Sequence, residues 1–286
     1  MLDNIIISGF ADEIDMNLDE QLRVVKELGM NYICIRAADG KGIADYTPEE
    51  FQEKILPRLK AAGVGVSSLG SPIGKIGIDD EQAYATQLKQ LENLCQICKL
   101  ADCKYIRMFS FWMPKDKNPD DFTDQVLEKL EGFAKVAEKY DVILIHENEK
   151  DIYGDIGRRC KVILDRLASP HFKAAFDFAN FVQCGEDTEV CWEMLKQHVV
   201  YIHIKDAEAG TGTIVPPGKG AGHLAEILAK FKADGYTGFI SLEPHLTNFT
   251  GLSGLEKEVE ERHTTLTGEE AFTLAHDCLV EILDKI

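Results

Sequence analysis

The sequence predicts an α/β protein, a single (β/α)8 barrel domain that takes up residues 1–286. Three observations lead to this prediction. Short apolar segments and amphipathic segments alternate eight times along the chain, and eight parallel strand–helix units favour a closed barrel over an open sheet. A length of 286 residues suits one barrel, and no linker suggests a second domain. No Gly-x-Gly-x-x-Gly motif follows the first apolar segment, which argues against a dinucleotide-binding fold.

The first four units are recognised by apolar runs and by residues that start or stop helices. Asn17 is suited to cap the first helix, and Gly29 ends it. The sequence TPEE at 47–50 has the cap, the first-turn proline and the early acids of a second helix. We therefore predict strands at 5–10, 32–36, 64–69 and 105–109, and helices at 17–28, 47–62, 80–100 and 120–140.

The second four units follow the same pattern. We predict strands at 142–145, 172–177, 199–203 and 239–243, a helix that ends near Leu167, and helices at 189–197, 221–233 and 268–283. Residues 210–222 are rich in glycine and proline and contain PPGKG at 216–220. Such a loop is expected to form a mobile cover over a site at the strand ends, with Lys219 reaching a substrate.

Composition excludes several classes of partner. The chain has 31 Lys and Arg against 49 Asp and Glu, a formal charge of −18, which repels nucleic acids and anionic membrane surfaces. A small, neutral or locally captured substrate fits better. No apolar run approaches the roughly 18 residues of a membrane span, so a cytoplasmic protein is expected. The eight cysteines show no disulfide pattern and are expected to be reduced.

Polar residues stand at the ends of four consecutive predicted strands. They are Glu147, Asp177, His203 and Glu243. Because parallel strands bring their carboxyl ends to one rim of a barrel, we expect these side chains to meet. Three carboxylates and one imidazole suit a divalent cation such as Mn, Mg, Co or Zn. Any one of them alone is more often an ordinary polar residue that closes a strand, whereas four in succession indicate a metal site.

Residues of other loops on this rim are candidates for substrate binding. Lys75 ends the glycine-punctuated loop 70–75, and a solvated lysine in a turn is an equally good interpretation. Arg107 lies in the fourth strand, where its guanidinium could reach a substrate oxygen. Trp112 follows and could lie against a sugar ring. Packing of these loop aromatics against a neighbouring subunit is the alternative, so a homo-oligomer stays an open expectation.

Several segments resemble the xylose-isomerase-like TIM barrel superfamily of sugar isomerases, ketose epimerases, inosose dehydratases and apurinic-site endonucleases. The resemblance covers nearly the whole chain, and its most specific segments are IHENE at 145–149, FDFAN at 176–180, YIHIKD at 201–206, PGKG at 217–220 and SLEP at 241–244. It implies one divalent metal, most often Mn, bound by Glu147, Asp177, His203 and Glu243. Lys205, within the third segment, is expected to contact the substrate.

The resemblance also implies a reaction. Glu147 and Glu243 would flank a sugar carbon as base and acid, and the cation would stabilise the enediolate formed by proton abstraction next to a carbonyl. The favoured function is therefore a metal-dependent isomerase or epimerase of a sugar, keto-sugar or cyclitol.

Two departures from the family pattern keep alternatives open. Ketose epimerases usually have a second histidine three residues after the metal-binding Asp, where this chain has Asn180. The absence of this histidine supports an alternative hypothesis, in which the protein is a catalytically silent barrel that binds a sugar or serves as a scaffold. His146 precedes Glu147 and would face outward in a regular strand, or reach the site as a separate base if the strand has ended. In the second case the protein would be a lyase or dehydratase that acts on an oxidised sugar or 3-oxo-glycoside by β-elimination.

Overall fold

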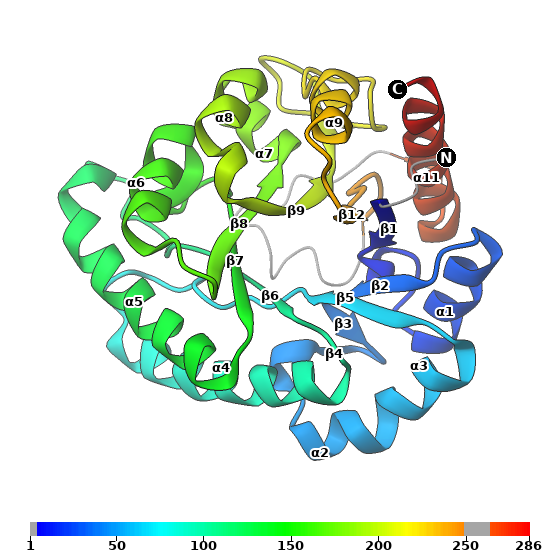
Figure 1. Ribbon diagram of the computed structural model, residues 1–286, viewed down its shortest axis with the longest axis horizontal. Helices are drawn as coiled ribbons and strands as arrows, with labels where there is room; N and C mark the ends of the chain where they lie inside the picture. The colour runs from blue at the N-terminus through cyan, green and yellow to red at the C-terminus, as the bar shows by residue number, and fades with distance from the viewer. Residues whose placement is uncertain (1–4, 249–263) are drawn as a thin grey trace.

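A computed structural model describes residues 5–248 and 264–286, and its centre is a nearly closed parallel barrel (Figure 1). The strands are hydrogen-bonded in the order β1-β12-β9-β8-β7-β6-β5-β2. A single parallel bridge between Phe10 and Cys34 joins the two ends of this order. The predicted (β/α)8 fold is confirmed. The barrel strands are β1 (Ile5–Gly9), β2 (Tyr32–Ile35), β5 (Gly65–Leu69), β6 (Tyr105–Met108), β7 (Ile143–Glu147), β8 (Phe172–Asp177), β9 (Val199–Ile204) and β12 (Gly238–Leu242).

Helices surround the barrel on the outside (Figure 1). Those that follow the predicted pattern are α1 (Leu18–Glu27), α3 (Leu56–Ala62), α4 (Glu81–Leu100), α5 (Thr123–Tyr140), α6 (Gly157–Leu167), α8 (Thr188–Leu195), α9 (Leu224–Ala233) and α11 (Gly268–Lys285). Side chains at several starts accept backbone N–H groups, as Asn17 does from Asp19 and Asp80 does from Ala83. The predicted caps therefore decide where these helices begin.

The structure corrects two predicted segments. The helix predicted at 47–62 is α2 (Pro48–Glu50), a π-helical turn at Phe51–Ile55 and then α3. Pro57 has no N–H to donate inside the helix, which accounts for the irregular turn before it. Residues 178–183 were not predicted to be helical, but they form α7 (Phe178–Gln183), whose start is capped by the Asp177 side chain that accepts the N–H of Asn180.

Two short antiparallel hairpins decorate the barrel. One joins β3 (Ala37–Ala38) to β4 (Lys41–Gly42), and the other joins β10 (Asp206–Ala207) to β11 (Ile214–Val215). The second strand of this second hairpin, β11, lies within residues 210–222, which were predicted as a glycine-rich loop. The hairpin begins two residues after β9, at the end of the barrel that carries the polar strand tips.

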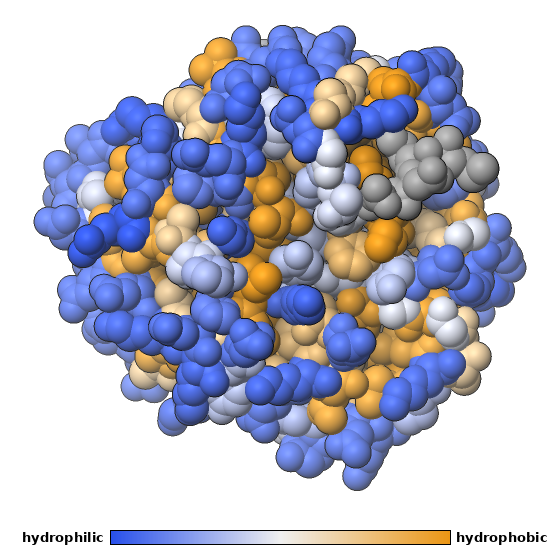
Figure 2. All heavy atoms as spheres, viewed as in Figure 1, coloured by the Kyte–Doolittle hydropathy of each residue, from blue (hydrophilic) through white to orange (hydrophobic). Residues whose placement is uncertain are grey.

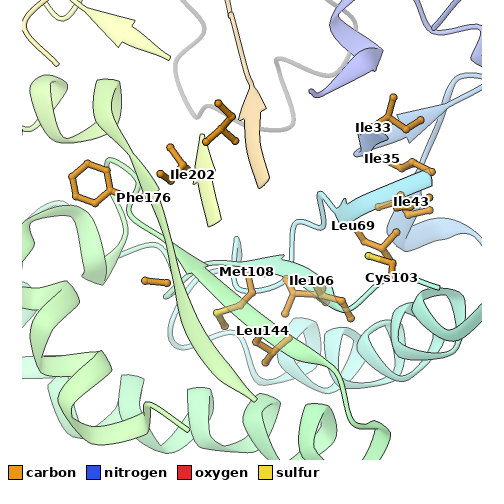
Figure 3. Packing of buried hydrophobic residues seen from close by; sticks show 14 of the residues in the cluster. Ile33, Ile35, Ile43, Leu69, Cys103, Ile106, Met108, Leu144, Phe176 and Ile202 are labelled. Carbon is orange, nitrogen blue, oxygen red and sulfur yellow. The ribbon is translucent and has the colours of Figure 1, made fainter. Parts of the chain in front are cut away.

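Alternation along the strands separates an outer apolar layer from the barrel interior. Ile106, Met108, Leu144, Phe176 and Ile202 point away from the barrel axis and pack beneath the helices, as Figure 3 shows for part of this core. The residues between them therefore point inward. Ile145, Ala175 and Tyr201 form a separate small cluster inside the barrel.

The surface agrees with the composition. Hydrophilic residues dominate the periphery of the face shown in Figure 2. Within the two described ranges no helix combines the length and the apolar character that crossing a membrane requires. All eight cysteines are free thiols.

Candidate metal centre

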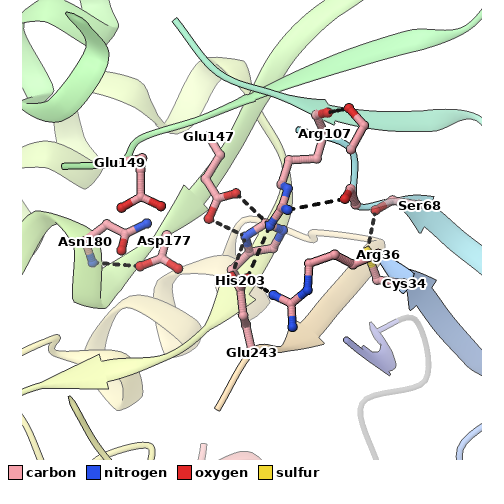
Figure 4. A network of polar contacts seen from close by, with 12 residues as sticks. Cys34, Arg36, Ser68, Arg107, Glu147, Glu149, Asp177, Asn180, His203 and Glu243 are labelled. Atoms are coloured by element: carbon pink, nitrogen blue, oxygen red, sulfur yellow. Dashed lines mark hydrogen bonds and ion pairs between the residues drawn. The ribbon is translucent and has the colours of Figure 1, made fainter. Parts of the chain in front are cut away.

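Four side chains from neighbouring strands meet at the carboxyl end of the barrel (Figure 4). Each of Glu147, Asp177, His203 and Glu243 offers one ligand atom, and these atoms all lie within 4.8 Å of one another. The four residues are at most 2% exposed. Glu147 and Asp177 end β7 and β8, His203 lies in β9, and Glu243 directly follows β12. The strand-end pattern thus brings these four residues together.

Asparagine side chains hold the tips of β7 and β8 side by side. Asn148 donates to the carbonyl oxygen of Asp177 at 2.9 Å and accepts the Asp177 N–H at 3.0 Å. Asn180 donates to the carbonyl oxygen of Asn148 at 2.9 Å. Asn180, which stands where ketose epimerases usually have histidine, therefore braces the two strands that carry Glu147 and Asp177.

Hydrogen bonds and charge set the protonation of the cluster. His203 Nδ1 lies 2.9 Å from Glu147 Oε1 and 3.4 Å from Glu243 Oε2. Burial favours neutral His203, but the adjacent Glu147 outweighs it and raises the His203 pKa to about 9. Burial opposes ionisation of Glu147 as well, yet His203 and Arg107 hold its pKa below the ordinary value. Asp177 differs, since burial prevails over Lys205 and raises its pKa to about 7.

Three buried cations contact the same carboxylates. Arg107 lies 3.3 Å from Glu147 Oε2 and 3.2 Å from Glu243 Oε1. Arg36 contacts Glu243 Oε1 at 2.9 Å, and Lys205 contacts Asp177 Oδ2 at 3.2 Å. Sequence reasoning did not select Arg36. It follows the apolar run of β2, so the signal that identified the four strand-end residues also applied to it.

A second group of side chains adjoins the first. Glu13, Glu243 and His245 also bring ligand atoms within 4.8 Å of one another. Here a protein cation already lies between the carboxylates, because Arg36 contacts Glu13 at 3.2 Å and Asp12 at 2.8 Å. Burial raises the pKa of Glu13 to about 8 despite Arg36. This second group is therefore less suited to a metal ion than the first.

The donor set fits a divalent cation. Four buried atoms, one on each of the four residues, lack a hydrogen-bond partner: Glu147 Oε2, Asp177 Oδ2, His203 Nε2 and Glu243 Oε2. Buried polar atoms without hydrogen bonds are costly, and metal coordination is one way to satisfy them. Formal charge points the same way. Seven buried carboxylates at this end of the barrel face four buried lysine and arginine side chains, which leaves three negative charges: Asp12, Glu13, Glu147, Glu149, Asp177, Asp206 and Glu243 against Arg36, Lys75, Arg107 and Lys205.

His146 does not reach the cluster. It lies in β7 with the strand still regular, on the face of Leu144 and opposite to Glu147. Its Nε2 lies 2.9 Å from Ser110 Oγ, which also accepts the N–H of Gly154. Burial lowers the His146 pKa to about 4. The structure therefore corrects the hypothesis that His146 reaches the site as a base. His146 faces outward from the barrel and has a structural position.

The predicted substrate-binding residues fall into two groups. Lys205, Arg107 and Lys75 are buried at the strand ends, and Lys75 pairs with Glu149 at 3.0 Å above the ring of Phe109. Trp112 is half-buried and makes bridges to Gly77 and Ile152 of its own chain. Lys219 is exposed and lies toward α11, where it adds to the effect of Lys285 in lowering the Glu281 pKa. The structure thus places Lys219 away from the cluster, because the backbone of its loop, not its side chain, turns inward.

Comparisons with known proteins agree with the barrel fold. The model of the family described as "Xylose isomerase-like TIM barrel" matches residues 22–265. No curated protein sequence matches. Similar solved structures include IOLI protein with a binding zinc atom, at 19% identity and a TM-score of 0.76, covering 98% of both chains.

Two further solved structures carry names of sugar epimerases. One is 3-keto-D-glucoside 4-epimerase, YcjR, from E. coli, at 17% identity and a TM-score of 0.71, covering 98% of this chain and 99% of the other. The other is D-allulose 3-epimerase from Methylomonas sp. in complex with D-allulose, at 14% identity and a TM-score of 0.74, covering 99% and 98%. At these identities the likeness concerns the fold.

Proposed function

The chain belongs to the xylose isomerase-like TIM barrel family, and from this premise we propose that it is a divalent-metal-dependent isomerase or epimerase of keto-sugars or cyclitols. The observation that carries the proposal is the cluster of Glu147, Asp177, His203 and Glu243, in which each residue has one buried atom that lacks a hydrogen bond. These four residues would hold the ion. Manganese is our first choice, with Mg, Co or Zn as alternatives that suit the same donors.

The positions of Glu147 and Glu243 suit proton transfer. β7 and β12 are the outer members of the four neighbouring strands that carry the cluster, so the two carboxylates approach from opposite sides. Charged neighbours hold the pKa of both below its usual range, Lys205 and His203 being foremost for Glu243, so both are ionised at neutral pH. One ionised carboxylate can take a proton from the carbon next to a carbonyl, and its counterpart can return a proton to the other face after it has itself taken one up from solvent.

The other residues of the site orient these carboxylates. Arg107 contacts both Glu147 and Glu243, and Arg36 holds Glu243 from the side of β2. Such contacts fix the carboxylates in place before a substrate arrives. A bound divalent ion would supply stabilisation of the negative charge that develops on the substrate oxygens.

Exchange of a carbon-bound proton tests the proposal. The purified protein, loaded with Mn or Zn, is incubated with a panel of ketoses and inososes in deuterated water and followed by NMR. We expect exchange with at least one member. Asp177→Asn should lower both bound metal and the exchange rate, the rate by at least about 10³-fold, whereas Asp165→Asn, at a half-exposed carboxylate of α6, should change neither.

Two results would count against the proposal. One is the absence of exchange with every member of the panel, and the other is an Asp177→Asn protein that keeps both metal and exchange. If the protein binds near-stoichiometric metal but shows no exchange, a silent sugar-binding barrel becomes the better interpretation.

His146→Asn separates the lyase alternative. Because His146 faces Ser110 outside the barrel, this variant should retain metal and exchange. A wild-type protein that releases an enone from a 3-oxo-glycoside, and loses that activity in His146→Asn with metal content intact, would favour the lyase.

A further inference from the structure

The loop after β9 folds its glycines around a carboxylate of the same chain. Asp206 Oδ2 accepts the N–H groups of Gly218 and Gly220, both at 2.9 Å. Asp206 Oδ1 accepts those of Gly222 and Ala207, also at 2.9 Å. Glycine is required for this approach, since a Cβ atom at Gly220 would lie 2.4 Å from Asp206 Oδ1. Four backbone donors thus converge on one buried anion.

Such a cradle of backbone N–H groups is the kind of structure that binds phosphate in other proteins. In (β/α)8 barrels, phosphate sites are frequently built from the loops after the seventh and eighth strands. β9 is the seventh strand of this barrel, and Asp206 lies three residues after His203. The position where a phosphate group would be expected is therefore filled by the protein's own carboxylate.

The charge balance of the strand ends leads to the same conclusion. One divalent cation does not fully offset the three negative charges left by the seven buried carboxylates and four buried cations, so the net charge stays at −1. A phosphate ester carries about −1.5 to −2 at neutral pH, so these buried charges do not favour its binding, whereas an uncharged sugar adds no negative charge.

Two of the buried cations are neutralised by carboxylates that lie outside the proposed ligand set. Arg36 contacts Asp12 and Glu13, and Lys75 contacts Glu149 at 3.0 Å. A phosphate that captured either cation would leave these buried carboxylates without their partner, which costs several kcal/mol. Neither cation is thus readily available to an anionic substrate group.

We infer that the site is built for an uncharged keto-sugar or cyclitol, and that Asp206 is a specificity-determining residue that keeps phosphate out of the loop after β9. The inference rests on the proposed function and narrows its substrate class.

Matched substrate pairs test the inference. The metal-loaded wild-type protein is given ketoses and their terminal phosphate esters at equal concentration, with proton exchange in deuterated water and binding by calorimetry measured for each pair. We expect kcat/KM for the phosphate ester to be lower by at least about 100-fold, which corresponds to roughly 2.7 kcal/mol. Equal or faster exchange with the phosphate esters would overturn the inference.

Calorimetry keeps the inference separate from the proposed function. If no compound exchanges, the proposed function fails, and binding alone decides the substrate class. Tighter binding of free ketoses than of their phosphate esters supports the inference, and tighter binding of the esters, or weak and equal binding of both, overturns it.

Sulfate probes the glycine cradle directly. In Asp206→Ala the four N–H groups lose their acceptor, so 10 mM sulfate should raise Tm more in this variant than in the wild type, relative to chloride at equal ionic strength. If Asp206→Ala does not fold, Asp206→Asn, which keeps the shape of the side chain, replaces it in the same experiment. The expected rise in Tm with sulfate is then smaller. A wild-type protein that sulfate stabilises as strongly as either variant would refute the role of Asp206.

Discussion

The interior of the barrel has two levels, which differ in how their buried polar groups are paired. At the strand ends, charged side chains contact one another, and several of them, the four proposed metal ligands included, retain a buried atom without a hydrogen bond. Deeper in the barrel the polar groups are neutral. Ser8 Oγ lies 2.6 Å from Ser67 Oγ, which lies 2.8 Å from the hydroxyl of Tyr201, two residues before His203.

This difference separates stability from function. The hydroxyls of Ser8, Ser67 and Tyr201 can donate and accept, so they bond one another and the Ile33 carbonyl oxygen without a ligand. Carboxylates accept only, and their surplus at the upper level needs a cation that the protein does not supply. The lower level is therefore interpreted as part of the core, and the upper level as the place where a ligand completes the structure.

Removal of a buried cation should show the largest effect. Arg36→Met keeps most of the apolar stem but leaves Asp12, Glu13 and Glu243 without their shared partner. We expect a loss of about 3–5 kcal/mol in the free energy of unfolding, measured in urea. Arg58→Met is the matched control, because Arg58 pairs with the more exposed Asp19 and Asp39, and its loss should cost less than about 1 kcal/mol. Equal losses in the two variants would contradict the larger stabilisation expected from the buried ion pairs of Arg36.

A pH titration of the metal-free protein should show the next effect. Raised pKa values of about 8 for Glu13, 7 for Asp177 and 9 for His203 mean that the folded state binds more protons than the unfolded state near pH 7–8. Stability then falls as pH rises, by roughly 2 kcal/mol across this unit. Calorimetry of the chelated protein checks this fall.

Two variants test whether the fall in stability with rising pH originates in the upper level. Glu13→Gln should remove part of the slope, whereas Tyr201→Phe in the lower level should leave it unchanged. A melting temperature of the chelated protein that stays constant or rises from pH 7 to pH 8 would contradict the cited protonation states.

The smallest effect is expected in the lower level. Tyr201→Phe removes one hydroxyl, but Ser67 keeps its contact with Ser8 and its bond to the Ile33 carbonyl oxygen at 3.1 Å. The expected cost is about 1 kcal/mol in unfolding free energy. Metal content should not change. A variant that loses metal would show that the two levels are not separable.

The sequence by itself determined the features that repeat locally. Short apolar runs that alternate with amphipathic segments, together with helix caps such as Asn17, predicted the barrel, because these patterns depend on residues close together in the sequence. The same local logic predicted that Glu147, Asp177, His203 and Glu243 would share one rim. Alternation also offered the outward position of His146 as one of two choices, and the regular strand selected it.

Only the tertiary structure decided which charges meet. Arg36 and Glu243 are 207 residues apart, and no pattern in either segment encodes their contact. The inward turn of Asp206 likewise depends on the N–H groups of Gly218 and Gly220, which lie more than ten residues further along the chain. Lys219, between these two glycines, is exposed. Local periodicity specifies which face a side chain occupies, whereas pairing between faces follows from closure of the barrel, which brings distant strand ends within hydrogen-bond distance.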